Sequence, residues 1–266
     1  MADEKKQVDS KINKIAPIMM GKGKDSLNTD NSHNKGENSF ERLVPSLIEK
    51  GIENINLSMF SEEMRKDLLN AAGEEYIKRG MAIDAIKVFN LTGNKESLLR
   101  IADQYRDEGY FANAIDVYNL AGDKKKLVET GDKCVKMGNL PDAAKAFNLA
   151  GEKEKLQRVA EEWYNRDRFD YAIQAYSDLG NRQKLIEIGD VCTDKRQYAY
   201  AADAYERAQD NDRLSRLADI LFKEGLFNSA YKLYRVANNA IMLEFLEQNF
   251  GDRILKEDFM DTSSNY

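Results

Sequence analysis

The 266-residue sequence predicts an all-α protein, a right-handed α-solenoid of about six helical hairpins with capping helices at both ends. Two observations predict this fold. Composition favours helices, with only 3 prolines and with 32% charged residues, because prolines break helices and long charged side chains lose little rotamer freedom on them. An apolar pattern also recurs every 29 residues, and a period of that length indicates stacked copies of one supersecondary unit. We therefore expect each hairpin to bury its apolar face against the next.

The repeat is defined most clearly by an alanine followed four residues later by an aromatic residue. The alanines are Ala85, Ala114, Ala143, Ala172, Ala201 and Ala230. The aromatic residues are Phe89, Tyr118, Phe147, Tyr176, Tyr205 and Tyr234. A leucine recurs at the same interval, at Leu69, Leu98, Leu127, Leu156, Leu185, Leu214 and Leu243.

The second unit illustrates how each hairpin is built. Its first helix, called helix A below, places Leu98, Ala102 and Tyr105 on one face, since residues three, four and seven apart align on a helix. Gly109 then breaks the chain, and a shorter helix, called helix B, ends at Gly122. Asp167 and Arg196 stand where two other units would have this glycine. We expect those two turns to use another geometry.

These elements divide the chain into four parts. Residues 1–38 are polar and predicted to be disordered, because they have too few large apolar side chains to offset the entropy of ordering. Residues 39–64 are predicted to form N-terminal capping helices, with a helix start at Ser61. Residues 65–238 contain the six repeats, and residues 239–266 a C-terminal capping helix followed by a frayed tail.

The repeat resembles the tetratricopeptide repeat in residue type and register. Leu98, Ile101, Ala102 and Tyr105, followed by Ala114, Tyr118 and Ala121, are the residues on which the resemblance depends. The period of 29 is shorter than that family's 34, and the proline that usually closes each unit is absent. The shortened units are also similar to the helical-hairpin repeats of vesicle-coat subunits, in which pairs such as Gly122-Asp123 separate hairpins. Either resemblance implies a protein-interaction scaffold.

Charge and residue usage narrow the classes of function. A net charge of −6 and a pI near 5.2 argue against a protein whose main task is to neutralise nucleic-acid phosphates. The only histidine is His33, in the polar tail. Cys134 and Cys192 occupy a helix A core position, so we expect buried packing cysteines. We predict no catalytic residues, no cofactor, no metal site and no enzyme activity.

The candidate partner-binding residues follow a second row along helix A. One residue after the small residue of each helix A comes a carboxylate, at Glu74, Asp103, Asp132, Glu161, Asp190 and Asp219. On a helical wheel this position lies opposite the apolar face, so we expect it to face solvent. By resemblance, it would line a concave groove. The apolar residues that we expect to line the groove beside these carboxylates are Leu99, Val128, Tyr164 and Phe222.

Such a groove would suit a basic or amphipathic peptide or helix. We therefore expect a cytoplasmic, non-catalytic adaptor for protein partners, with no membrane span. An equally open interpretation is that the carboxylates are ordinary solvated residues and that their apolar neighbours pack between repeats.

Two further functions stay open. Basic residues recur at the turns between units, at Lys95, Lys124, Lys153 and Arg182 and at Lys126, Lys155, Lys184 and Arg213. This basic edge, together with the lysines of the tail, would suit an RNA- or ribosome-associated factor. A coat-like, self-assembling subunit is the third interpretation.

Overall fold

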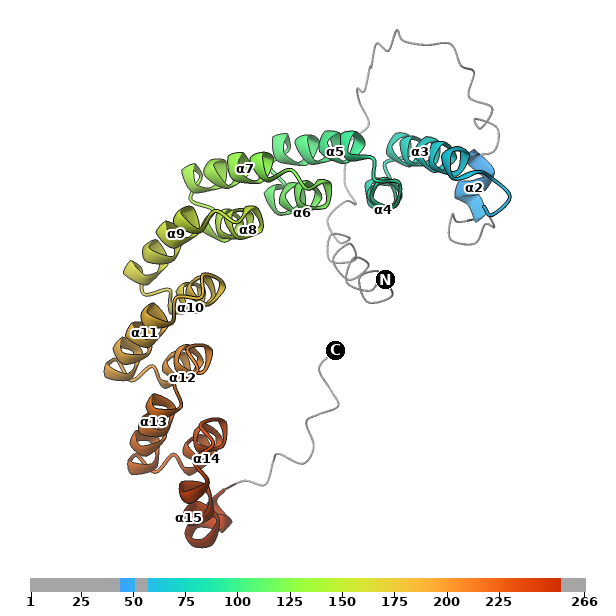
Figure 1. Ribbon diagram of the computed structural model, residues 1–266. Helices are drawn as coiled ribbons and strands as arrows, with labels where there is room; N and C mark the ends of the chain where they lie inside the picture. Colours follow the sequence, from blue (N-terminus) through green and yellow to red (C-terminus); the bar gives the residue numbers. More distant parts are fainter. Residues whose placement is uncertain (1–43, 51–56, 255–266) are drawn as a thin grey trace. The chain divides into compact units, whose positions relative to one another are not determined.

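A computed structural model of the protein describes residues 44–50 and 57–254. Within these residues all regular structure is helical, and consecutive helices pack against one another as in an α-solenoid (Figure 1). The helix A copies are α3 (Glu62–Lys78), α5 (Lys95–Asp107), α7 (Lys124–Lys136), α9 (Lys153–Asn165), α11 (Arg182–Asp194) and α13 (Asn211–Lys223). The helix B copies are α4 (Ala82–Thr92), α6 (Phe111–Ala121), α8 (Leu140–Ala150), α10 (Phe169–Asp178), α12 (Tyr198–Arg207) and α14 (Phe227–Val236).

Helices flank these hairpins on both sides in sequence. On the N-terminal side α2 (Val44–Lys50) packs on α3, which begins after the predicted cap Ser61, whose hydroxyl accepts a hydrogen bond from the Met64 N–H. On the C-terminal side α15 (Ala240–Phe250) is followed by a short 3₁₀ turn, Gly251–Arg253. The predicted polar tail 1–38 and the frayed end lie outside the described residues.

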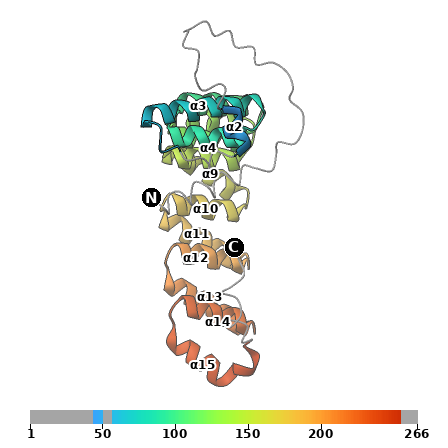
Figure 2. The same ribbon diagram turned by 90° about the vertical axis from the view of Figure 1, so that its right-hand side faces the viewer.

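The helices form two compact units, which divide between α7 and α8, inside the third predicted repeat. In the first unit, α3, α5 and α7 form one layer, and α4 and α6 form the other (Figure 1). The second unit repeats this arrangement from α8 to α15, with its helices stacked one after another (Figure 2). Helix B copies also touch each other directly, as α4 with α6 and α10 with α12.

Small residues on helix A allow the two helices of a hairpin to approach closely. A Cβ atom added to Gly73 would lie 2.5 Å from Cε1 of Phe89, and one added to Gly189 would lie 2.3 Å from Cε1 of Tyr205. Such distances are far below van der Waals contact, so the helix B ring occupies the space that a side chain on helix A would need. The position is glycine or alanine in every repeat, because the ring of helix B leaves room for a methyl group at most.

The turns within the hairpins correct one prediction. Asp167 and Arg196 were expected to need another geometry, but their φ angles of 56° and 57° lie in the same left-handed region as the 87° of Gly109. The expectation was wrong because packing on both sides of the turn holds the same path, even where a side chain makes that conformation less favourable.

Candidate partner-binding site

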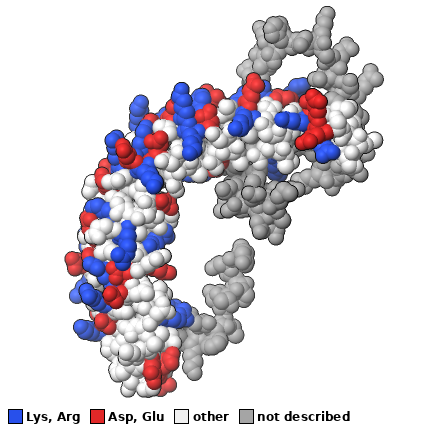
Figure 3. Space-filling model, viewed as in Figure 1, with Lys and Arg blue, Asp and Glu red and all other residues white. Residues whose placement is uncertain are grey.

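The six predicted carboxylates lie at one register position on α3, α5, α7, α9, α11 and α13. In each unit, charged side chains of both signs are interleaved over the layer formed by these helices (Figure 3). The carboxylates therefore have basic and polar neighbours, and what they contact decides how much of their charge remains available.

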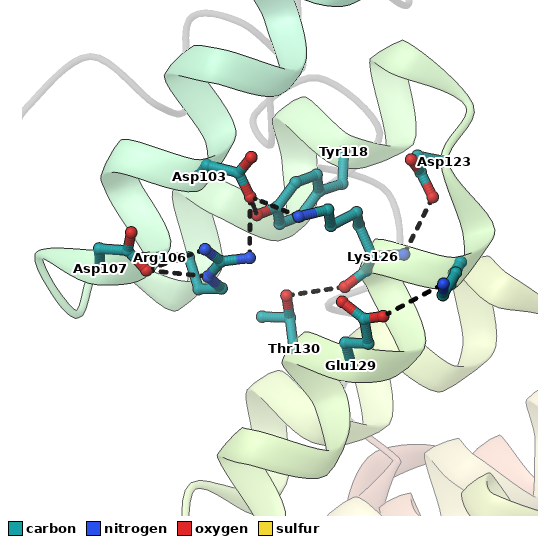
Figure 4. A network of polar contacts seen from close by, with 9 residues as sticks. Asp103, Arg106, Asp107, Tyr118, Asp123, Lys126, Glu129 and Thr130 are labelled. Atoms are coloured by element: carbon teal, nitrogen blue, oxygen red, sulfur yellow. Dashed lines mark hydrogen bonds and ion pairs between the residues drawn. The ribbon is translucent and has the colours of Figure 1, made fainter.

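Asp103 on α5 is the centre of a three-helix network (Figure 4). Its Oδ1 accepts a hydrogen bond of 2.6 Å from the Tyr118 hydroxyl of α6 and one of 3.0 Å from Lys126 Nζ of α7. Arg106, one turn along α5, forms an ion pair with the same oxygen at 2.8 Å. The other oxygen, Oδ2, points away from these three donors (Figure 4).

This network keeps Asp103 ionised. Partial burial opposes the charge, but the hydrogen bonds from Tyr118 and Lys126 and the positive charge of Arg106 outweigh it, so the pKa of Asp103 lies below its ordinary value of 3.8. Burial, followed by the hydrogen bond to Asp103, raises the pKa of Tyr118 well above its ordinary range. The pair therefore consists of a neutral phenol donating to a charged carboxylate, which is the stronger class of hydrogen bond.

Asp190 repeats the arrangement in the second unit. Its Oδ1 accepts from the Tyr205 hydroxyl at 2.8 Å and from Arg213 Nε at 3.0 Å, while Oδ2 accepts from the second guanidinium nitrogen at 3.3 Å. Burial again opposes ionisation, but the bonds from Arg213 and Tyr205 lower the pKa of Asp190. Asp219 likewise accepts from the Tyr234 hydroxyl of its own hairpin.

The other two carboxylates of the first unit, Glu74 and Asp132, have no tyrosine at the position that Tyr118 occupies beside Asp103. The first hairpin has Phe89 in place of tyrosine, and Glu74 instead accepts from Ser97 at 3.0 Å and from Arg100 at 2.6 Å, both on the next helix A. Asp132 is half-buried on α7, and the aromatic residue of its predicted repeat, Phe147, also lacks a hydroxyl.

The fourth repeat and the helix that follows it place a carboxylate, a tyrosine and a lysine at the corresponding positions, but these residues do not make the same bonds. Glu161 is exposed and accepts from Gln157 at 3.0 Å, and Lys184 donates to Glu187 at 2.8 Å. The buried Tyr176 hydroxyl is left without a hydrogen-bond partner among the described residues. Glutamate stands here in place of aspartate, and its carboxylate bonds to Gln157 rather than to Tyr176.

The predicted apolar neighbours are half-buried rather than fully exposed. Leu99 and Val128 are each partly covered. Tyr164 meets the ring of Phe169 edge to face at 6.1 Å. Phe222 packs against the rings of Phe227 and Phe250, each at 5.5 Å. All four side chains are therefore partly packed and partly exposed to solvent.

The helix A carboxylates pair with residues of the basic edge, which was not predicted from the sequence. Lys126 and Arg213, placed on the basic edge, are the partners of Asp103 and Asp190. Asp103 was also expected to face solvent, whereas it is half-buried because Tyr118 reaches it from α6. A signal was present, since aspartate, tyrosine and a basic residue recur at intervals of 15 and 23 residues in two of the repeats.

The basic edge is therefore only partly available to a phosphate. Arg182 donates to the Ala208 carbonyl at 2.8 Å and lies 3.6 Å from Asp210. Lys125, which neighbours this edge, has 87% of its side chain exposed and lies 4.0 Å from Glu129. Helix N-terminal caps such as Asp123, whose side chain accepts from the Lys126 N–H, place further negative charge among these bases.

Groups suited to chemistry are sparse in the described part of the chain. No group of three or more histidine, cysteine or acidic residues there could hold a metal ion. Cys134 and Cys192 are buried, as predicted, and burial raises the pKa of Cys192 to about 11. No described helix is both long and apolar enough to cross a bilayer. His33 lies outside the described residues.

No protein-family model matches the chain, and no curated protein matches it significantly in sequence.

Proposed function

We propose that the chain is a non-catalytic scaffold that binds a basic or amphipathic segment of a protein partner through the helix A carboxylates. One observation supports this most directly. Asp103 and Asp190 are held ionised at one register position of their hairpins, each by a tyrosine and a basic residue. A carboxylate fixed in this way loses little rotamer freedom when it accepts a further hydrogen bond.

Partial exposure leaves these groups able to meet a partner. The side chains of Asp103 and Asp190 are 35% and 50% exposed. Leu99 lies one helical turn before Asp103, and Val128 one turn before Asp132, so an apolar side chain adjoins each of these carboxylates. A partner with basic and apolar residues alternating along a helix would match this spacing.

Glu161 offers the cleanest test, because its only described bond is to Gln157 within its own helix. We expect Glu161→Lys to reduce recovery of a partner in quantitative affinity purification with mass spectrometry, without changing thermal unfolding. Glu206→Lys is the matched control, since it makes the same charge change at an exposed position of α12, outside the helix A row. Equal recovery by the wild type and both variants would overturn the proposal.

Two finer assignments accompany this function. The repeats are proposed to be a shortened form of the tetratricopeptide repeat, on the residues from Leu98 to Ala121 that resemble it. The cytoplasm is the proposed location, and cell fractionation with an antibody against the chain tests it.

A further inference from the structure

The last helix that the structure describes, α15, exposes large apolar side chains. Ile241 and Phe245 on α15 are 81% and 41% exposed. They are four residues apart and therefore lie on one face of the helix, one turn from each other. Leu243 and Leu246 mark the opposite, core-facing side, where Leu246 is fully buried.

The preceding repeats provide an internal control for this face. The register position of Ile241 is occupied from α5 to α13 by Glu96, Lys125, Glu154, Gln183 and Asp212. The position of Phe245 is occupied by Arg100, Glu129, Arg158, Glu187 and Arg216. Every equivalent residue is polar or charged, so apolar side chains are specific to α15 and are not a property of the repeat.

Phe245 packs against aromatic rings of α13 and of its own helix. The Phe245 ring lies 6.1 Å from that of Phe222 and 6.0 Å from that of Phe250. Phe250 is in turn stacked on Phe227 at 4.7 Å. These ring contacts connect the exposed face to the packed core of the last hairpin, and they fix the position of the Phe245 side chain.

α15 differs from the earlier helix A copies at the position of their small residue. Glu247 stands at the position of the small residues Ala160, Gly189 and Ala218, which allow a helix B ring to approach. Its Oε1 accepts a hydrogen bond of 2.6 Å from the Tyr231 hydroxyl. α15 therefore lacks the small residue against which the helix B ring packs in the earlier repeats.

The charges of α15 indicate which occupant fits. Its two charged residues, Glu244 and Glu247, are both acidic, whereas each of the other helix A copies contains lysine or arginine. Glu244 is exposed beside Phe245 on the face of Ile241, and it accepts a hydrogen bond of 3.0 Å from Gln248 of its own helix. Glu247 is bonded to Tyr231 of α14. Two copies of this face would bring like charges together, which disfavours a symmetric pairing.

We propose that this face of α15 docks a basic amphipathic helix of a protein partner. Apolar residues of that helix spaced by three or four positions would cover Ile241 and Phe245, and a lysine or arginine beside them would pair with Glu244. This is a second docking surface, separate from the carboxylate row, and it extends the proposed scaffold function.

The test uses the full chain and a fluorescein-labelled helical peptide of about 18 residues with leucines on one face and lysines on the other. Binding is followed by fluorescence anisotropy. We expect Ile241→Ser with Phe245→Ser to weaken binding by at least roughly tenfold, and Glu244→Lys to weaken it as well. The matched control, Glu154→Ser with Arg158→Ser, changes the same register positions on α9 and should leave affinity unchanged.

Three results would overturn the proposal. The first is equal affinity of the α15 variant and the control. The second is binding that appears only after residues 255–266 are removed, which would assign the face to the chain's own end. The third is a concentration-dependent dimer in sedimentation that the α15 variant abolishes. The carboxylate row is proposed to bind the same class of peptide, so Glu161→Lys is measured in parallel. A loss of affinity in Glu161→Lys without one in the α15 variant would overturn the α15 surface alone, and the reverse result would count against the carboxylate row alone.

Discussion

Tyr118 and Tyr176 occupy the same position in two hairpins, yet their hydroxyls meet different surroundings. Tyr118 donates to the ionised Asp103, whereas the Tyr176 hydroxyl is buried without a described partner. Burial raises the pKa of Tyr176 to about 12, so the hydroxyl stays protonated at neutral pH in either case. A buried donor without an acceptor costs free energy, and a bonded one contributes to stability.

Removal of each hydroxyl should therefore have opposite effects on stability. We expect Tyr118→Phe to lower the free energy of unfolding by about 1 to 3 kcal/mol, because it removes a hydrogen bond to a charged group. Tyr176→Phe should leave stability unchanged or raise it by up to about 1 kcal/mol. Urea denaturation measures both, and a clear loss in Tyr176→Phe would show that its hydroxyl has a partner.

Gly73 has no side chain, and the Phe89 ring packs in the space that a side chain would occupy. We expect Gly73→Ala to destabilise the protein by about 1 to 3 kcal/mol, because the new methyl group must displace the Phe89 ring from a filled core. Gly251→Ala is the control, since an added Cβ there meets no atom within 4 Å. If thermal unfolding of Gly73→Ala matched the wild type, the close approach of the two helices would be wrong.

At the scale of the element, helix A begins in a consistent way. The side chains of Asn94, Asp123, Asn181, Asp210 and Asn239 each accept a hydrogen bond from the backbone N–H three residues further along the chain. Glu152, before α9, makes no such bond. Its longer side chain does not adopt the short, local geometry of an N-cap.

An N-cap can therefore be added to α9. We expect Glu152→Asn to raise the free energy of unfolding by about 1 kcal/mol, because the backbone at 152, with φ −83° and ψ 76°, matches that of the capped Asn181, with φ −85° and ψ 78°. Asn181→Ala should lower it by a similar amount. Chemical denaturation of the two variants provides the measurement, and no gain from Glu152→Asn would contradict the assignment.

The turn that follows each helix B keeps the same left-handed conformation whether or not its residue is glycine. At the end of helix B, Gly93, Gly122, Gly151 and Gly180 are replaced in the last two repeats by Gln209 and Asn238, with φ angles of 54° and 56°. Glycine is the residue that accepts this conformation at least cost. Its replacement shows that hairpin packing, rather than the turn residue, sets the path of the chain.

At the scale of the whole molecule, the carboxylate networks link stability to pH. The pKa values of Asp103 and Asp190 are lowered from 3.8, so the folded state binds their protons less readily than the unfolded state does. Their contribution to stability is complete above about pH 4 and is lost as the pH falls through the lowered values.

Acid should therefore destabilise the chain partly through these two residues. We expect the wild type to lose stability more steeply than Asp103→Asn/Asp190→Asn between about pH 4 and pH 2, with the two curves parallel above pH 5. Urea titrations monitored by circular dichroism at several pH values provide the test. Parallel curves down to pH 2 would show that the networks do not hold these carboxylates in their charged form.

Much of the architecture could be predicted from the sequence, because the repeat is local. A helix is defined by residues three and four positions apart, and caps and turns by residues within one turn of each other. The alternation of helix A and helix B, the start of α3 at Ser61 and the burial of Cys134 and Cys192 were all predicted in this way and are confirmed. The partner-binding role of the carboxylates stays a prediction.

The sequence by itself determined which residues form helices and which helical face is apolar, because these depend on neighbours along the chain. Only the tertiary structure decided that Asp103 pairs with Tyr118 and Lys126 while Glu161 leaves Tyr176 unpaired. Those outcomes depend on how residues 15 and 23 positions apart in the sequence meet across packed helices. The same holds for the apolar face of α15, which is exposed because no described helix covers it.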